Sequence, residues 1–332
     1  MNDSEILQII NTNDNDEIES LFLKARNVRK IHYGKSVFIR GLIEITNYCK
    51  NDCYYCGIRC SNLNLERYRL SPEEILNCCR TGDELGIKTF VIQGGEDPWF
   101  NKKRVTEIVS LIRQEFPGNA ITLSLGERPI SDYEAFYKAG ANRYLLRHET
   151  ASDSHYEKLH PSCQTLSKRK ECLWTLKKIG YQVGAGFMTG SPFQTPENLL
   201  ADIRFLEELQ PQMVGIGPFI PQINTPFGGY PAGDLQLCLK MTAITRILLT
   251  KALIPATTAM GTIASNGREL ALNAGANIIM PNLSPASAKK LYVIYDNKAT
   301  GADEAAENLT LIKEKIIKAG YEPDMCRGDA LT

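Results

Sequence analysis

The chain has 332 residues with 38 basic and 38 acidic side chains, so its formal net charge is zero. That balance argues against nucleic acid or an anionic membrane surface as a partner, because binding to either calls for a basic excess or patch. The sequence holds no apolar run near the roughly 18 residues of a membrane span, and its acidic beginning leads into no apolar stretch of the kind found in secretory signals.

The first elements predicted along the chain are two helices within residues 3–33. In the second of them, apolar side chains from Ile18 to Val28 recur at helical spacing. We expect residues 1–36 to form a helical cap and residues 37–332 to form a single structural domain with a C-terminal helix.

From residue 37 onward, short β-branched runs alternate with amphipathic stretches. Eight runs are predicted as strands, at residues 37–46, 89–93, 120–125, 143–147, 183–188, 213–219, 254–258 and 277–280. Helices are predicted after them, from residue 71 and at about residues 102–116, 131–140, 165–180, 196–209, 234–252, 266–275 and 301–320. Eight apolar strands, each followed by a helix, predict an α/β fold with a parallel sheet buried on both faces. The count of eight favours a complete (β/α)8 barrel of the TIM type over an open sheet.

Three cysteines follow the first run, at Cys49, Cys53 and Cys56. Thiolates spaced as C-x3-C-x2-C on one loop are close enough to ligate one iron–sulfur cluster. Three ligands leave one iron of a 4Fe–4S cube without a protein ligand, and a small molecule can bind there. Cys60 extends the pattern to four cysteines, so a ferredoxin-like site with no open iron is an alternative at this point. Ten cysteines at irregular spacing indicate a metal site in a cytoplasmic enzyme rather than a disulfide framework.

Functional side chains of such barrels gather where the strands end. The second run ends in Gly94, Gly95 and Glu96. The two glycines allow a ligand to approach the backbone closely, and the carboxylate of Glu96 can accept hydrogen bonds from an ammonium group. We interpret this stretch as a cofactor contact.

The fourth run carries Arg143 and Arg147, four residues apart and therefore on one side of a strand. Because a charge inside a barrel is costly unless paired, we interpret both as holders of an anion or carboxylate, with an internal salt bridge as the alternative. Glu149 is a candidate partner for a cationic or hydroxylated ligand. Thr257 and Thr258, at the end of the seventh run, offer hydroxyl groups to a polar ligand, with ordinary β-branched strand residues as the alternative. Together, the polar strand ends suit a barrel that encloses a cofactor and a small anionic substrate.

The cysteine spacing, with the aromatic Tyr55 before the last cysteine, resembles the signature of the radical S-adenosylmethionine (SAM) superfamily. Over residues 37–295 the chain also resembles the HydE-type maturases of FeFe-hydrogenase. The stretches that carry this second resemblance are Ser-Leu-Gly-Glu at 124–127, Arg-His-Glu-Thr at 147–150 and Ala-Thr-Thr-Ala-Met-Gly-Thr at 256–262.

The resemblance implies one 4Fe–4S cluster on Cys49, Cys53 and Cys56, with SAM bound to the open iron. It implies further cofactor contacts from Tyr55, Gly94, Gly95, Glu96, Glu149 and Arg169. The substrate positions that it implies are Arg40, Arg143, Arg147, Met213, Thr257, Thr258 and Tyr292. After residue 298 the only cysteine is Cys326, so no auxiliary cluster is predicted.

The activity implied by the resemblance is reductive cleavage of SAM to methionine and a 5′-deoxyadenosyl radical. The substrate would be a small cysteine-derived iron carbonyl–cyanide compound, used in building the di-iron active site of the hydrogenase. A low-potential electron donor and other hydrogenase maturation proteins are the implied partners.

Two other classes of function remain open from the sequence. One is a related radical enzyme, either a methylornithine-synthase-like mutase or a biotin-synthase-like sulfur inserter, although the strands carry no added cysteines for a sulfur-source cluster. The other is a non-catalytic iron–sulfur scaffold or electron carrier. A carrier needs no cofactor pocket, so the stretch at residues 94–96 argues against it.

Overall fold

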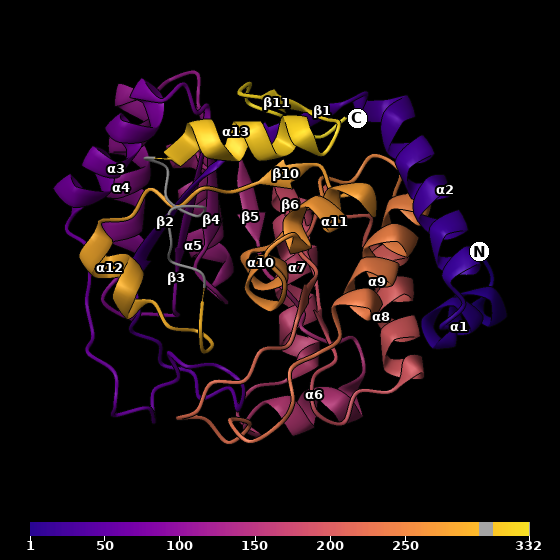
Figure 1. Ribbon diagram of the computed structural model, residues 1–332. Coiled ribbons are helices and arrows are strands. Elements are labelled where there is room, and N and C mark those ends of the chain that lie inside the picture. Colours follow the sequence, from indigo (N-terminus) through magenta and orange to yellow (C-terminus); the bar gives the residue numbers. More distant parts are fainter. Residues whose placement is uncertain (299–307, 332) are drawn as a thin grey trace.

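The computed structural model describes residues 1–298 and 308–331. Two N-terminal helices, α1 (Asp3–Asn11) and α2 (Asn15–Tyr33), lie on the outside of the molecule beside α8 (Pro196–Leu209) and α9 (Leu235–Leu248) (Figure 1). The side chain of Asn2 caps α1 together with Glu5, and Asp14 caps α2. Their buried apolar faces therefore pack against the outer helices of the central domain.

The centre of the molecule is a ring of parallel strands. Six of them form one sheet in the order β2 (Gly41–Thr46), β3 (Thr89–Gly94), β4 (Ala120–Ser124), β5 (Arg143–Leu145), β6 (Gln182–Ala185) and β8 (Met213–Val214). Single parallel bridges, Met213 to Leu253 and Pro255 to Ile278, continue the ring to β10 (Ile278–Ile279). β10 pairs with β1 (Ser36–Ile39), and a bridge from Leu42 to Asn282 joins β2. The predicted α/β barrel is thereby confirmed.

Several predicted strands are shorter or split. The first run divides at Arg40 into β1 and β2, and the fifth and sixth runs divide into β6 with β7 (Met188–Thr189) and β8 with β9 (Gly217–Pro218). At Gly186, between β6 and β7, φ is +153° and an added Cβ would lie 2.0 Å from the carbonyl oxygen of Gly215. The seventh run forms only bridges, in part because Pro255 has no N–H to donate.

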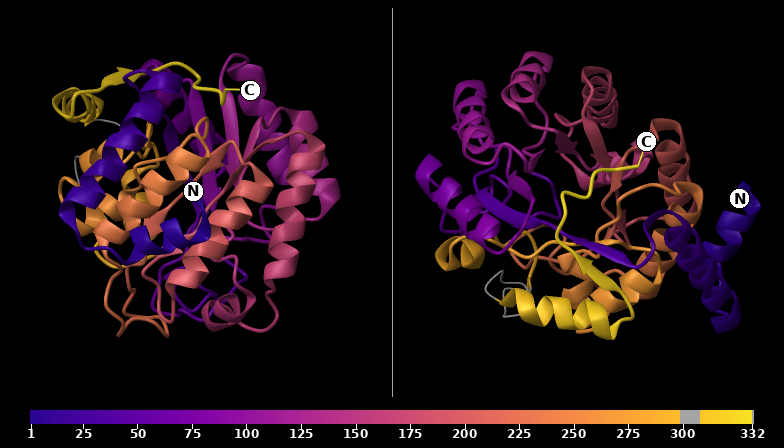
Figure 2. Two further views of the ribbon diagram at one scale, coloured as in Figure 1. Left: turned by 90° about the vertical axis from the view of Figure 1, so that its right-hand side faces the viewer. Right: turned by 90° about the horizontal axis from the view of Figure 1, so that it is seen from above.

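Helices surround the strands on all sides (Figure 2). The expected ones are α3 (Pro72–Glu84), α4 (Lys102–Glu115), α5 (Ile130–Ala139), α7 (Leu166–Ile179), α8, α9, α11 (Gly267–Asn273) and α13 (Leu309–Lys318). α3 begins with a capping box at Ser71 and a proline in its first turn, as its sequence indicates. The predicted residues 301–307 of the last helix lie outside the described residues. Three short helices were not predicted, namely α6 (Asp153–Leu159), α10 (Thr258–Ile263) and α12 (Ala286–Leu291).

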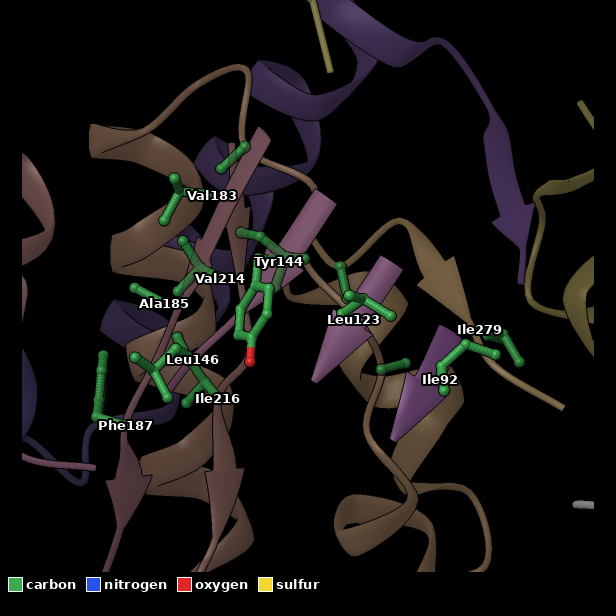
Figure 3. Packing of buried hydrophobic residues seen from close by; sticks show 14 of the residues in the cluster. Ile92, Leu123, Tyr144, Leu146, Val183, Ala185, Phe187, Val214, Ile216 and Ile279 are labelled. Atoms are coloured by element: carbon green, nitrogen blue, oxygen red, sulfur yellow. The ribbon is translucent and has the colours of Figure 1, made fainter. Parts of the chain in front are cut away.

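The core lies between the ring of strands and the helices. Side chains of neighbouring strands, among them Ile92, Leu123, Val183 and Val214, form one continuous apolar layer (Figure 3). Burial of this layer on every strand is the main force that holds the barrel together. Among the described residues, no helix has the length and apolar character needed to cross a membrane.

The end of the barrel where the strands begin is covered by the C-terminal tail, which we define as residues 325–331. The tail follows β11 (Glu322–Asp324), which pairs in parallel with β1. Thr89, at the start of β3, donates to the carbonyl oxygen of Arg327 at 2.8 Å. Gly328 adopts a φ of +56°, and an added Cβ there would lie 2.8 Å from the ring of Phe38. The tail runs across this end of the barrel in Figure 2.

Candidate active site

The cysteine loop follows β2 and is held by an arginine. The guanidinium of Arg67 donates hydrogen bonds to the backbone carbonyl groups of Asn47, Ile58, Arg59 and Asn62. A second arginine, Arg59, forms an ion pair with Asp52 inside the loop. The loop therefore has a defined path, because the guanidinium of Arg67 satisfies several of its carbonyl groups.

Cys49, Cys53 and Cys56 are free thiols, each partly exposed, on this loop. Burial raises the pKa of Cys53 to about 12, and the nearby Cys49 adds to that shift. Burial, followed by the charges of Cys53 and Cys49, raises the pKa of Cys56 well above its ordinary value. Without a metal the thiols are therefore protonated at neutral pH, and cluster binding would release their protons.

Glu96 connects the cysteine loop to the neighbouring strand ends. Its backbone carbonyl accepts from the N–H of Lys50 at 3.0 Å, and its Oε2 lies 3.4 Å from Lys50 Nζ. Its Oε1 accepts from the backbone N–H of Glu127 at 2.8 Å. Arg169, on α7, pairs with Glu127 at 2.6 Å and lies 4.0 Å from Glu96. The two predicted cofactor residues Glu96 and Arg169 are thus parts of one charged network.

Glu149 lies just beyond the end of β5 in an unusual backbone conformation. Its φ is +66°, a region that a non-glycine residue enters only where the surroundings hold it. The surroundings here are Gly186, whose carbonyl accepts from the N–H of Glu149, and Met188, whose N–H donates to the Glu149 carbonyl. The side chain of Glu149 pairs with Arg147 at 2.9 Å.

A cavity of about 350 Å³ lies at the end of the barrel where the strands finish. It brings together most of the predicted site residues, namely Cys49, Cys53, Cys56, Tyr55, Gly94, Gly95, Glu96, Glu149, Arg169, Arg147, Thr257, Thr258 and Tyr292. Arg147 and Thr257 line it, and their buried donors Arg147 Nε and Thr257 Oγ1 have no hydrogen-bond partner within the described part of the chain. An added Cβ at Gly217 would lie 3.3 Å from Thr257 Oγ1 and 3.9 Å from Arg147 Nη1, so both side chains approach the same backbone position.

Three residues predicted to bind substrate, Arg40, Arg143 and Met213, do not line this cavity. They lie where the strands begin: Arg40 donates to the carbonyl of Gly328 at 3.0 Å and contacts Met213 Sδ, while Arg143 pairs with Asp329 at 2.8 Å. Side-chain alternation along one strand predicted that Arg143 and Arg147 lie together. Four residues of strand span about 13 Å, so the two guanidinium groups serve opposite ends of the barrel.

The cavity also contains charged residues that the sequence analysis did not select. Glu44, on β2, is fully buried, pairs with Lys298 and accepts from Asn282 Nδ2 at 2.9 Å. A charged residue inside a continuous apolar run was the available signal for Glu44, since an ion is buried only with a partner. No sequence pattern singles out Lys298, because its pairing depends on a contact 254 residues away. Tyr292 is held nearby by Gln93, whose Nε2 donates to its hydroxyl at 3.3 Å.

The residues present fit the two groups implied by the resemblance. Three reduced thiols on one loop match the ligand set of a cluster with an open iron. No described set of three or more His, Cys, Asp or Glu side chains could hold a single metal ion, and a cube of irons holds its ligands further apart than one ion does. At Gly95 an added Cβ would lie 2.2 Å from the Tyr48 carbonyl oxygen and 2.8 Å from Cys49 Cβ. Only glycine leaves the cysteine loop and this strand end so close together.

Comparisons with known proteins agree with this geometry. A family model described as the radical SAM superfamily matches residues 43–206. The FeFe-hydrogenase maturase subunit HydE of Thermotoga maritima is 45% identical over 316 residues, which cover 95% of this chain and 90% of that protein. The 3-methylornithine synthase of Methanosarcina acetivorans is 30% identical over 97% of this chain and 90% of its own length. A crystal structure of methylornithine synthase has a TM-score of 0.87 at 29% identity, covering 97% of this chain and 94% of that one. This chain therefore belongs to the radical SAM superfamily and, within it, to the HydE type of FeFe-hydrogenase maturases.

Proposed function

We propose that this radical SAM enzyme acts on a small, cysteine-derived iron carbonyl–cyanide compound during assembly of the di-iron active site of FeFe-hydrogenase. The family uses a 4Fe–4S cluster with SAM, and when bound and reduced this cluster supplies the electron that cleaves SAM to methionine and a 5′-deoxyadenosyl radical. Cys49, Cys53 and Cys56 would hold the cluster, and Glu96 and Glu149 would contact the polar groups of SAM.

The observation that carries the proposal is the distribution of polar groups in the cavity. The cysteines line this cavity, and so do Arg147 and Thr257, whose Nε and Oγ1 atoms are buried without partners in the described residues. A buried donor without an acceptor costs about 1–3 kcal/mol, and an anionic substrate would remove this cost. Cyanide and carboxylate groups are acceptors of the required kind, and the identity with HydE of Thermotoga maritima supports this substrate class.

The other side chains of the cavity would position the substrate and exclude water. The Glu44–Lys298 pair and Tyr292 lie in the wall, where burial raises the pKa of Tyr292 well above its ordinary value. Tyr292 is therefore a neutral hydrogen-bonding group across the physiological range. We infer that a low-potential electron donor and other hydrogenase maturation proteins are the partners, and that the protein works in the cytoplasm.

Hydrogenase maturation in vitro tests the proposal, with this protein as the only component missing from the mixture. Addition of the reconstituted protein with SAM and a reductant is expected to restore hydrogen production, and the Cys53→Ala variant is expected to give none. The Arg147→Met variant should still cleave SAM but should lose most maturation. If the unaltered protein cleaves SAM, fails to support maturation and converts lysine to methylornithine, the proposed substrate class is wrong.

A further inference from the structure

The cysteine loop contacts the segment of residues 159–164, which begins at the last residue of α6. The backbone N–H of Tyr54 donates to the carbonyl of Leu159 at 3.0 Å. The hydroxyl of Tyr55 lies 3.1 Å from Nε2 of His160. Cys53 Sγ lies 3.6 Å from the side-chain amide oxygen of Gln164. Three consecutive residues of the cysteine loop thus contact one short segment that the family's cysteine motif does not include.

The proton positions in this contact follow from the partners. His160 Nδ1 lies 3.0 Å from the carbonyl oxygen of Tyr156, which can only accept, so Nδ1 carries the ring proton. Burial, with the charge of Arg169, lowers the pKa of His160 to about 3, so the ring is neutral. Nε2 is then an acceptor, and the Tyr55 hydroxyl donates to it. This hydrogen bond fixes the ring of Tyr55, and with it the backbone on either side of that residue.

The contact of Gln164 with Cys53 depends on whether the sulfur carries a proton. In the free protein the thiol donates S–H to the amide oxygen. A cluster-bound sulfur has no proton and becomes an acceptor, so an amide oxygen at this position would face negative charge. Within the described residues the side chain of Gln164 makes no other hydrogen bond. A half-turn of the amide therefore exchanges its oxygen for Nε2–H and breaks no other contact.

We propose that Gln164 is a positioning residue that donates an N–H···S hydrogen bond to the Cys53 ligand and thereby raises the reduction potential of the cluster. The negative charge on the ligand sulfurs increases when the cluster is reduced. A donor at the sulfur therefore stabilises the reduced form more than the oxidised form, as hydrogen bonds to cluster sulfurs do in other iron–sulfur proteins. The proposal rests on the family's cluster and is independent of the maturase substrate.

The neighbourhood of Cys53 favours a donor at this point. The other charges that act on this sulfur are Cys49 and Glu149, which are negative when ionised, and Arg169, which is positive. Arg169 is the one charge of this set that favours a negatively charged sulfur. Arg169 forms an ion pair with Glu127 at 2.6 Å, whereas Gln164 is a neutral residue in contact with this sulfur.

The test is a redox titration of the reconstituted full-length protein without SAM, followed by electron paramagnetic resonance of the reduced cluster. Gln164→Leu removes the donor and keeps the volume, and Gln164→Glu replaces it with an acceptor that carries charge. We expect the midpoint potential to shift downward in the leucine variant and further downward in the glutamate variant. Cys163→Ser, one residue away with an exposed side chain, is the matched control and should show the potential of the unaltered protein.

Iron content and an exchangeable-proton signal separate tuning of the potential from a merely structural role. Both Gln164 variants should retain the full iron content. Electron–nuclear double resonance in light and heavy water should detect an exchangeable proton at the cluster in the unaltered protein and lose it in Gln164→Leu. An unchanged potential at full iron content overturns the proposal. Loss of the cluster in both variants overturns it as well, since Gln164 would then serve assembly, and neither result affects the proposed maturase activity.

Discussion

Replacing Arg143 by methionine should weaken the fold without removing the chemistry. The guanidinium of Arg143 is fully buried and donates to the carbonyl groups of Arg327 and Gly328, at 3.0 and 3.1 Å, and to Asp329 at 2.8 Å. These three acceptors belong to the C-terminal tail. The methionine side chain would keep much of the apolar stem and lose every one of these hydrogen bonds.

The expected loss of stability depends on which hydrogen-bond donors each acceptor retains when Arg143 is replaced. The Arg327 carbonyl retains Thr89 and the Gly328 carbonyl retains Arg40, so neither becomes fully unpaired. Asp329 is 41% exposed at its side chain and can be hydrated. Hydrogen bonds to charged groups contribute about 1.5–3 kcal/mol each. The loss of all three is partly offset, because the acceptors keep other donors or water and because Arg40 and Arg143 repel each other. We therefore expect the free energy of unfolding to fall by about 3 kcal/mol, near the lower limit for breaking a buried charged network.

Urea unfolding followed by circular dichroism measures this loss, and SAM cleavage by the same variant measures the chemistry. Arg147→Met is the matched control, since Arg147 lies in the cavity and makes no contact with the tail. That control breaks one ion pair, with Glu149, so its free energy of unfolding should fall by less than that of Arg143→Met, and it should impair maturation. If Arg143→Met were as stable as the unaltered protein and had lost maturation, Arg143 would bind substrate and its assignment to the tail would be wrong.

Three further outcomes are expected. Glu96→Gln should weaken SAM binding by about tenfold or more, because charged hydrogen bonds contribute about 1.5–3 kcal/mol. Isothermal titration calorimetry with the cluster-loaded protein measures the affinity for SAM. Unchanged affinity would remove Glu96 from the cofactor site. Although burial alone would raise it, the hydrogen bond and charge of Arg143 hold the pKa of Asp329 below its ordinary value. The stability difference between the unaltered protein and Asp329→Asn should therefore be full above about pH 4 and disappear as pH falls through the lowered pKa, and a constant difference down to pH 2 would contradict this. Cys60→Ser should keep the iron content and SAM cleavage of the unaltered protein, because Cys60 is exposed and does not line the cavity, whereas loss of iron would make Cys60 a cluster ligand.

Local signals in the sequence were enough to predict most helices and strands and the cysteine loop of the site. The capping box at Ser71 and the left-handed glycines at Gly140 and Gly180 mark helix ends by local hydrogen bonding and backbone sterics, and the structure places them there. The short helices α6, α10 and α12 have no side-chain cap hydrogen bond at their first turn.

The different surroundings of Arg143, in β5, and Arg147, two residues beyond this strand, depend on tertiary contacts. Side-chain alternation places Arg143 and Arg147 on one face of a strand, and this much the sequence contains. The position of each arginine, at one end of the barrel or the other, depends on the strand length. It also depends on the C-terminal tail, which is about 185 residues further along the chain. The same holds for Glu44 and Lys298, whose pairing spans 254 residues.

Three features could be predicted from the sequence: the cysteines share one loop, parallel strands alternate with helices, and a Gly-Gly-Glu stretch ends the neighbouring strand. These features depend on residues within a few positions of one another, because ligand spacing, helix capping and strand alternation act over short range. The tertiary structure alone decided which polar groups face the cavity, that the C-terminal tail covers the far end of the barrel, and that Gln164 lies against Cys53. Those contacts depend on closure of the ring of strands, which brings together residues that no local pattern relates.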